Sequence, residues 1–388
     1  MRILLLQDHI YLPSYGGGVK ANRMLLEALA ARGHECAAVT PAFAPSAGPA
    51  NDGEFREEME RRGVVVRERA GVSSYRFGGV EVDAVRSSSP DEVREHVEQR
   101  TRELAPDWVL VNDDKRRVLL TGALAGASGD RIVLLLQTIT NMPFGPLAVA
   151  PSEEQTLRMR EVRAIATISA FLQRYLACYG RLQSTVVRLP IYGDGPFPDA
   201  ARSDGRYATI VNPCLEKGVD VFLPLARALP EVEFAAVRGW GTDSALLRTL
   251  EEQPNVSVFE PADDLDDVLA STRVLLAPSL WPETFGYIVP EAMLRGIPVL
   301  ASDIGGLREA GLGAATLLPV ATLERRNGHY VGRPQAIGPW RSALQTLLAD
   351  SEEYARRSRD ARAAALAFVA EARAERFESF LAELGGPR

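Results

Sequence analysis

Two glutamates eight positions apart, Glu283 and Glu291, stand in the stretch with the strongest chemical signal. Residues 278–293 read Pro-Ser-Leu-Trp-Pro-Glu-Thr-Phe-Gly-Tyr-Ile-Val-Pro-Glu-Ala-Met and follow a short apolar run that predicts a buried strand. Proline is tolerated only in the first turn of a helix, so Pro290 predicts a helix that starts near residues 287–289. Glu291 then lies near a helix start that attracts anions, and a carboxylate accepts hydrogen bonds from vicinal hydroxyls. The pattern suits a ligand that carries both hydroxyl groups and phosphate.

Two glycine-containing turns also follow predicted strands and precede predicted helices. The first holds three consecutive glycines, Gly16–Gly18, followed by Lys20, and the second holds Lys217 within Cys-Leu-Glu-Lys-Gly-Val-Asp at 214–220. Glycines leave room for a ligand close to the backbone, and a helix start presents free N–H groups to an anion. Lys20 would add a charged hydrogen bond worth ~1.5–3 kcal/mol. The structural alternative is a flexible turn beside a solvated lysine, and neither turn matches a dinucleotide fingerprint or a P-loop.

Short apolar runs alternate with helical patterns along nearly the whole chain, which predicts an α/β fold with parallel sheets. Proline and glycine crowd residues 190–205, which we interpret as a linker between a domain over 1–195 and a domain over 205–369. Two doubly wound, Rossmann-like domains bind ligands at the carboxyl ends of their strands, and we expect them to face a central cleft. The predicted strands are 3–6, 36–40, 64–66, 108–111, 132–136, 164–168, 186–189, 208–211, 234–237, 256–259, 274–277 and 299–301.

The composition excludes several classes of protein. Apolar residues make up 46% and charged residues 24% of the 388 residues, which is typical of a folded globular chain and not of a disordered or fibrous one. The net charge of −7 disfavours general binding to nucleic acid, and no apolar run approaches the ~18 residues of a membrane span. Three scattered cysteines and four dispersed histidines give no metal framework, so we expect neither a metal nor a cofactor. The first apolar run is too short for a signal peptide, and we expect a cytoplasmic protein.

These motifs together resemble the retaining glycosyltransferases of family four, which have the GT-B fold. The segment from Glu283 to Glu291 matches the E-x7-E motif of that family, and Lys217 with the following glycine matches its phosphate-binding Lys-Gly. The likeness spans nearly the whole chain and is strongest over residues 208–310. Further matching segments are Gly296-Ile297-Pro298-Val299, Gly305-Gly306, Gly16–Gly18 and Arg32-Gly33-His34-Glu35.

The resemblance implies a metal-independent transferase of hexosyl type that moves a sugar from a nucleotide-sugar donor to a small-molecule or glycan acceptor. It implies that Lys217 contacts the donor diphosphate, that Glu283 contacts hydroxyls of the donor sugar, and that Glu291 holds the ribose. The backbone amides near Phe285 and Gly286 would approach the sugar or the phosphate.

The resemblance also assigns roles to the first domain. Gly17 and Gly18 would border the donor, and the domain would carry the acceptor side, where Lys20 and His9 are candidates. A C-terminal helix within residues 370–388 is expected to pack back on this domain.

Two positions depart from the pattern of the family. Asn212 stands where an arginine is usual, five residues before Lys217, and Arg238 after the next predicted strand is a candidate replacement for that cation. Gln137 stands where many relatives have a histidine close to the reacting sugar. An amide can hydrogen-bond a sugar hydroxyl but cannot transfer a proton. Gln137 is therefore a candidate catalytic residue that orients the donor, with a buried structural glutamine as the alternative.

These departures leave other functions open. One is a GT-B-fold nucleotide-sugar epimerase or a pseudo-glycosyltransferase coupling enzyme, and another is a non-catalytic protein that binds a sugar nucleotide. Retention of Lys217, Glu283 and Glu291 argues against the non-catalytic protein, because a purely structural role needs none of them.

Overall fold

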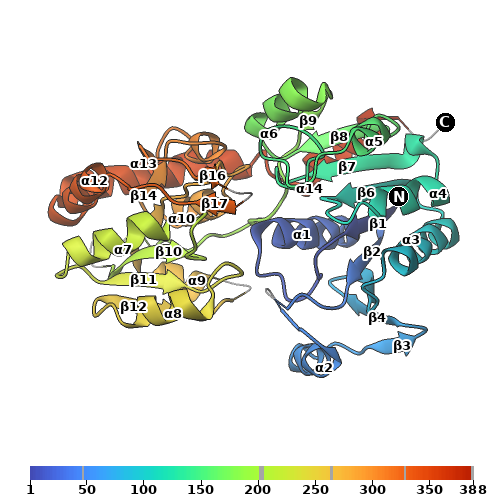
Figure 1. Cartoon of the computed structure of the whole chain (residues 1–388), viewed down its shortest axis with the longest axis horizontal. Helices are drawn as coiled ribbons and strands as arrows, with labels where there is room; N and C mark the ends of the chain where they lie inside the picture. The colour runs from blue at the N-terminus through green and yellow to red at the C-terminus, as the bar shows by residue number, and fades with distance from the viewer. Residues whose placement is uncertain (46–47, 201–204, 263–264, 327–328, 386–388) are drawn as a thin grey trace. The chain divides into compact units, whose positions relative to one another are not determined.

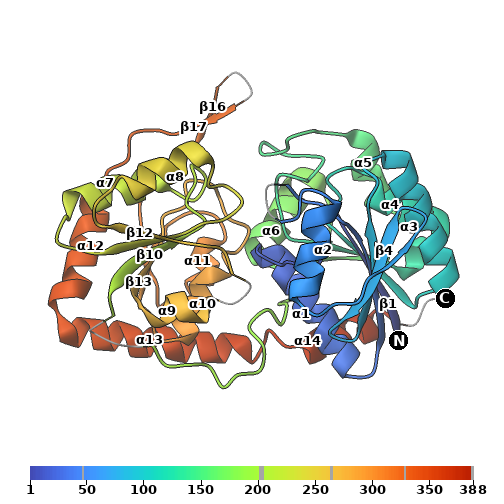
Figure 2. The same cartoon turned by 90° about the horizontal axis from the view of Figure 1, so that it is seen from below.

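The structure is a computed structural model that describes residues 1–45, 48–200, 205–262, 265–326 and 329–385 (Figure 1). The chain divides into two compact units. Unit 1 comprises Met1–Gly193 and Ala372–Arg388, and unit 2 comprises Asp194–Glu371. Each unit has its own sheet with helices on both faces (Figure 2), so the α/β class expected from the sequence is confirmed.

The sheet of unit 1 has the strand order β3-β4-β5-β2-β1-β6-β7-β8-β9 among the described residues. It is parallel from β5 to β9, and β4 and β3 are antiparallel additions at one edge. Its strands are β1 Arg2–Gln7, β2 Glu35–Pro41, β3 Arg67–Arg69, β4 Val72–Phe77, β5 Val80–Val85, β6 Trp108–Asn112, β7 Ile132–Leu136, β8 Ala164–Thr167 and β9 Thr185–Val186. Its α-helices are α1 Gly17–Ala31, α2 Asp52–Arg61, α3 Pro90–Leu104, α4 Leu119–Gly126, α5 Glu153–Arg158, α6 Ala170–Tyr175 and α14 Ala374–Glu383.

The central strands β1, β6 and β7 are buried, which their nearly continuous apolar sequences require. Helices α3 and α4 pack on one face of the sheet, where Val97 and Ala123 are fully buried. Helix α14 lies beside α1, and the guanidinium group of Arg32 binds Glu375 and Glu378 of α14.

Unit 2 is built on a parallel sheet with the strand order β12-β11-β10-β13-β14-β15 within the described part of the chain. Helices α7 and α12 cover one face, around the buried rings of Phe222, Phe234 and Trp340, and α10 packs against α13. The strands are β10 Tyr207–Val211, β11 Phe234–Val237, β12 Val256–Phe259, β13 Thr272–Ala277, β14 Val299–Ser302 and β15 Thr316–Leu318, with a hairpin of β16 Glu324–Arg326 and β17 His329–Val331. The helices are α7 Val219–Ala228, α8 Ser244–Glu251, α9 Asp266–Ala270, α10 Ile288–Leu294, α11 Leu307–Ala310, α12 Gly338–Ala349 and α13 Ser351–Val369.

One predicted strand at the edge of the first sheet is wrong. Residues 64–66 form no strand, and the strands β3, β4 and β5 follow them instead. Strand β4 buries Ser73 and Tyr75 but leaves the side chains between and beyond them more exposed. This half-buried pattern contains too few apolar residues to predict a strand from apolar runs alone.

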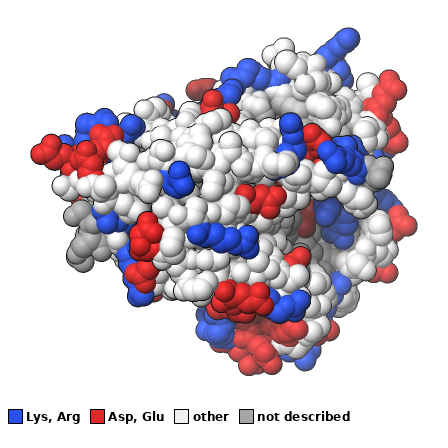
Figure 3. Space-filling view, turned by 60° about the vertical axis from the view of Figure 1, so that its left-hand side comes forward, with Lys and Arg blue, Asp and Glu red and all other residues white. Residues whose placement is uncertain are grey.

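The surface mixes charges of both signs. On the face shown in Figure 3, Lys and Arg side chains are interspersed with Asp and Glu. No helix in the described residues combines the length and the apolar character needed to cross a membrane.

Candidate functional site

Loops that follow β10, β13 and β14 are bonded to one another at the carboxyl edge of the unit 2 sheet. The carbonyl oxygen of Glu216 accepts hydrogen bonds from the backbone N–H groups of Leu280, at 2.9 Å, and Trp281, at 3.2 Å. Gly218 has a φ of +85°, and a Cβ atom there would overlap the carbonyl oxygen of Pro278. The loop after β10 therefore approaches the loop after β13 so closely that only glycine fits between them.

Lys217 and Glu283 form an ion pair within this group of loops. The Lys217 Nζ lies 2.7 Å from Glu283 Oε1. The hydroxyl of Ser279 donates a second hydrogen bond to the same oxygen, at 2.8 Å. The side chains of Lys217 and Glu283 are 28% and 15% exposed, so both remain accessible to a ligand. The structure thus brings together a cation and a carboxylate that the sequence placed 66 positions apart.

The loop after β13 is also fixed from the side of β14. The N–H of Gly306 donates to the carbonyl oxygen of Glu283 at 2.6 Å. A Cβ atom on Gly305 would lie 2.7 Å from the same oxygen. The glycine pair therefore allows the turn after β14 to support the backbone of Glu283.

Helix α10 starts at Ile288, within the range that Pro290 predicts. Glu291 lies in its first turn and is 8% exposed. Phe285 is buried, and its ring packs against Tyr287 and Phe368. Packing of this ring fixes the backbone that leads from Glu283 into α10.

The backbone conformation and the hydrogen bonding at position 212 favour asparagine over arginine. Its φ is +57°, a left-handed conformation that asparagine tolerates better than most residues. Its Oδ1 accepts the N–H of Gly241 at 2.9 Å, a bond that a guanidinium group cannot accept. Arg238, the candidate replacement cation, lies just after β11 and pairs with Glu260 at 2.7 Å. A role for Arg238 at a phosphate stays a prediction.

In unit 1, the glycine-rich turn leads into α1, which starts at Gly17. None of Gly16, Gly17 and Gly18 has a positive φ, and a Cβ atom on Gly16 or Gly18 would meet no other atom closer than 3.4 Å. Backbone conformation therefore requires glycine at none of the three positions, and packing does not require it at Gly16 or Gly18. The missing side chains leave the start of α1 uncovered. Lys20 lies half-buried in the first turn of α1, and His9 is exposed after β1.

Gln137 belongs to a network of four buried side-chain amides at the carboxyl edge of the unit 1 sheet. Its Nε2 donates to Oδ1 of Asn22, on α1, at 2.6 Å. The Nδ2 of Asn22 donates to Gln7 Oε1 at 2.8 Å and to Asn112 Oδ1 at 2.9 Å. These four residues are each 1–3% exposed. Asn22 thus ties the start of α1 to the ends of β1, β6 and β7.

The burial of Gln137, which is 2% exposed, favours the structural alternative for this residue. Its Nε2 also lies 3.4 Å from the carbonyl oxygen of Gly18, so the side chain does face the glycine-rich turn. Contact between Gln137 and a substrate stays a prediction, and its position is that of a group that supports the turn.

Asp113 is a buried carboxylate beside this network. It has a φ of +40°, and its Oδ1 accepts the backbone N–H groups of Gln137 and Thr138, each at 3.1 Å. Burial raises the pKa of Asp113 to about 6, although these hydrogen bonds act in the opposite direction. Burial likewise raises the pKa of Asp114 to about 6. Both carboxyl groups are therefore easier to protonate in the folded protein than in the unfolded chain.

We expect Asp113→Asn to stabilise the protein at pH 7.5 and to lose this advantage near pH 4. Between the ordinary pKa and about 6, the native wild type holds a proton that the unfolded chain has released, so its unfolding free energy falls as the pH rises. The asparagine keeps an oxygen that accepts both N–H groups but has no charge to bury. Urea unfolding of both proteins at several pH values should show a difference of about 3 kcal/mol at pH 7.5. A difference independent of pH would contradict the raised pKa.

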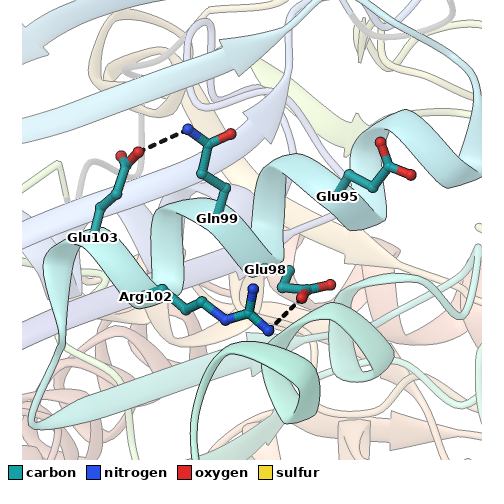
Figure 4. A pocket seen from close by; sticks show the side chains of 5 residues that line it. All are labelled: Glu95, Glu98, Gln99, Arg102 and Glu103. Carbon is teal, nitrogen blue, oxygen red and sulfur yellow. Dashed lines mark hydrogen bonds and ion pairs between the residues drawn. The ribbon is translucent and has the colours of Figure 1, made fainter.

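Other surfaces offer less chemistry. The concave surface on α3 in Figure 4 is lined by Glu95, Glu98, Gln99, Arg102 and Glu103. Its glutamates pair with neighbours on the same helix, as in the ion pair of Arg102 with Glu98. Among the described residues, no group of three or more His, Cys, Asp or Glu side chains is placed to hold a metal ion.

Comparison with known proteins connects the unit 2 loops to one family. Residues 205–350 match the family described as Glycosyl transferases group 1. This match lies within unit 2 and covers less than half of the chain. A D-inositol 3-phosphate glycosyltransferase of Gordonia bronchialis is 37% identical over 98 residues, which are 25% of this chain and 19% of that protein. The matched segment thus spans less than a third of the length of that curated relative.

Solved structures resemble the whole chain at low identity. Sucrose-phosphate synthase of Thermosynechococcus elongatus superposes with a TM-score of 0.69 and 16% identity, over 99% of each chain. HepE of Anabaena, solved in complex with UDP-glucose, has a TM-score of 0.65 and 18% identity, over 99% of this chain and 98% of that one. The GT-B fold expected from the sequence is confirmed by these likenesses.

Unit 2 contains a polar residue that was not predicted as a site residue, Ser279. It lies in the loop after β13 and donates to Glu283, four positions later, although both residues belong to an irregular segment and not to a helix. In unit 1, four buried polar residues were not predicted as site residues: Gln7, Asn22, Asn112 and Asp113. A signal for three of them was present, because Gln7, Asn112 and Asp113 each end or follow a buried strand.

Proposed function

We propose that the protein is a retaining, metal-independent glycosyltransferase that moves a hexosyl group from a nucleotide-diphosphate sugar to a small-molecule or glycan acceptor. The observation that carries the proposal is the contact of Lys217 with Glu283 at the carboxyl edge of the group 1 domain. The ammonium group suits a diphosphate, and the carboxylate suits sugar hydroxyls. The complex of HepE with UDP-glucose supports a nucleotide sugar as the donor class.

The chemistry requires stabilisation of a diphosphate leaving group and of an oxocarbenium-like sugar. In the proposal Lys217 stabilises the diphosphate, Glu283 contacts the sugar, and the backbone near Phe285 and Gly286 approaches either group. Glu291 holds the ribose. Such preorganised charges act strongest where water is excluded, and Glu283 is already only 15% exposed. The leaving phosphate accepts the proton of the acceptor, so the proposal needs no histidine at position 137.

The acceptor is proposed to bind unit 1. Gly17 and Gly18, at the start of α1, stay proposed to border the donor. Lys20 and His9 are the proposed acceptor-side residues. Gln137 is proposed to support the turn through Asn22 instead of contacting the sugar.

Nucleotide binding is the first test of the proposal. Calorimetric titration of the protein with UDP, GDP and ADP should show binding of at least one of them. We expect Glu291→Gln to weaken that binding by about tenfold, because a hydrogen bond to a charged group is worth ~1.5–3 kcal/mol. Unchanged affinity in this variant would rule out the ribose assignment, and no binding by the wild type would contradict the donor class.

Product analysis with a labelled donor separates the proposed transferase from an epimerase or a binding protein. A transferase releases nucleoside diphosphate and moves the label to an acceptor or to water, with the anomeric configuration retained. An epimerase changes the sugar on the nucleotide, and a binding protein leaves the donor intact. The assay contains EDTA, and activity that appears only after manganese or magnesium is added would contradict metal independence.

A further inference from the structure

We infer that Ser279 is a positioning residue that holds the Glu283 carboxylate whether or not Lys217 is engaged elsewhere. The inference rests on the proposed function, because it concerns the residue proposed to contact the donor sugar. Ser279 does not touch the sugar in this proposal. It acts through the orientation of Glu283.

The geometry assigns the two carboxylate oxygens to different tasks. Oε1 of Glu283 accepts from Lys217 Nζ at 2.7 Å and from Ser279 Oγ at 2.8 Å. A carboxylate oxygen accepts about two hydrogen bonds through its lone pairs, so Oε1 is saturated. Oε2 receives no hydrogen bond from the described part of the chain. Oε2, and not Oε1, is therefore the oxygen left to accept a hydrogen bond from an incoming hydroxyl.

The two donors to Oε1 differ in how firmly they are fixed. Ser279 is 3% exposed and has a single side-chain torsion before its hydroxyl. The residue that follows it is anchored, since the N–H of Leu280 donates to the carbonyl oxygen of Glu216 at 2.9 Å. Lys217 ends in a compact charge on a flexible stem and is 28% exposed. A serine hydroxyl in this setting is the more rigid of the two supports.

Of the two hydrogen-bond donors to Glu283 Oε1, donor-substrate binding would draw away only Lys217. A diphosphate carries more negative charge than a carboxylate and competes with Glu283 for the ammonium group of Lys217. When Lys217 turns to the phosphate, Ser279 is the remaining side-chain donor to Glu283 Oε1 in the described part of the chain. The backbone of Glu283 stays fixed through the N–H of Gly306. Ser279 therefore keeps Oε2 aimed at the sugar during the reaction.

Ser279→Ala tests this inference, with Ser302→Ala as the matched control. Ser302 is also a buried serine at the carboxyl end of a unit 2 strand, but its hydroxyl has no hydrogen-bond partner among the described residues. We expect Ser279→Ala to lower kcat for hydrolysis of a UDP-, GDP- or ADP-sugar by about tenfold or more. The Kd of the matching nucleoside diphosphate should stay unchanged, because that ligand lacks the transferred sugar that Glu283 is proposed to contact. Ser302→Ala should leave both quantities unchanged.

Equal kcat values for Ser279→Ala and Ser302→Ala would overturn the inference. So would a loss of nucleoside diphosphate affinity in Ser279→Ala as large as its loss of kcat, because that result indicates general damage to the loop.

A second measurement needs no donor and separates this inference from the proposed function. Crystal structures of ligand-free Lys217→Ala and of the Lys217→Ala, Ser279→Ala double variant would show where the Glu283 carboxylate lies. We expect it to stay bonded to Ser279 in the single variant and to leave this position in the double variant. A carboxylate that moves in the single variant, or stays in the double variant, would overturn the inference. Failure of every nucleotide to bind the wild type would instead count against the proposed function alone.

Discussion

Replacement of Glu283 by glutamine is expected to lower sugar transfer or donor hydrolysis by about 100- to 1000-fold, the size of effect seen when one preorganised charge-stabilising group is removed. The carboxylate is the group proposed to contact the donor sugar, where positive charge develops during departure of the diphosphate. A neutral amide keeps the size of the side chain but carries no compensating charge. Nucleoside diphosphate affinity should not fall, since that ligand lacks the transferred sugar and the glutamine no longer holds Lys217 in an ion pair. Steady-state kinetics beside calorimetry would measure both.

Glu251→Gln is the matched control for this variant. Glu251 is an exposed glutamate at the end of α8, in the same unit as Glu283. It does not belong to the loops that hold Glu283. We expect its turnover to equal that of the wild type. Turnover near the wild-type value in Glu283→Gln would remove Glu283 from the reaction. A fall in nucleotide affinity as large as the fall in turnover would assign Glu283 to binding.

The sequence predicted the central part of each sheet because parallel strands are buried on both faces and are therefore nearly continuous apolar runs. Strands β6 and β7 illustrate this, since all of their residues are buried. The same logic predicts where chemistry gathers, because a parallel sheet brings the residues after its strands to one edge. Lys217 follows β10 and Glu283 follows β13, and these strands are neighbours in the sheet. Their contact is thus a consequence of strand order, which the sequence alone did not provide.

The features of the site that were not predicted depend on side-chain hydrogen bonds that form only in the folded chain. Nothing in the spacing of Ser279 and Glu283 indicates a hydrogen bond, because both lie in an irregular loop whose path is set by contacts with Glu216 and Gly306. The substitution of arginine by Asn212 was visible in the sequence. Its reason, a left-handed backbone and an acceptor for Gly241, was not.

Gln137 shows the same limit for a residue singled out as catalytic. Its place after β7 was predictable, and a polar residue at a strand end is a reasonable candidate for a site. Its burial depends on Asn22, which projects from α1 and is more than 100 positions away in the sequence. Only the fold reveals that the amide of Gln137 is engaged by another amide.

Asn22→Ala is expected to lower the unfolding free energy of the protein by about 3 kcal/mol or more, because each buried polar group left without a partner costs ~1–3 kcal/mol. Removal of this side chain takes an acceptor from Gln137 and donors from Gln7 and Asn112. All three partners are at most 3% exposed, so water cannot readily replace the lost bonds. Asn22→Ala should also loosen the start of α1, which rests on this network.

Asn141→Ala is the control, because Asn141 is a half-buried asparagine in the same unit with one long hydrogen bond, of 3.4 Å, to the carbonyl oxygen of Asp113. Urea unfolding should show a loss below about 1 kcal/mol for this variant, in line with a single weak bond. Hydrogen exchange should then place the extra loss of Asn22→Ala in the first turns of α1, next to Gly18. Equal losses of unfolding free energy in the two variants would mean that the amides of Gln7, Asn112 and Gln137 form other hydrogen bonds. Asn22 would then not be the residue that holds the glycine-rich turn against the sheet.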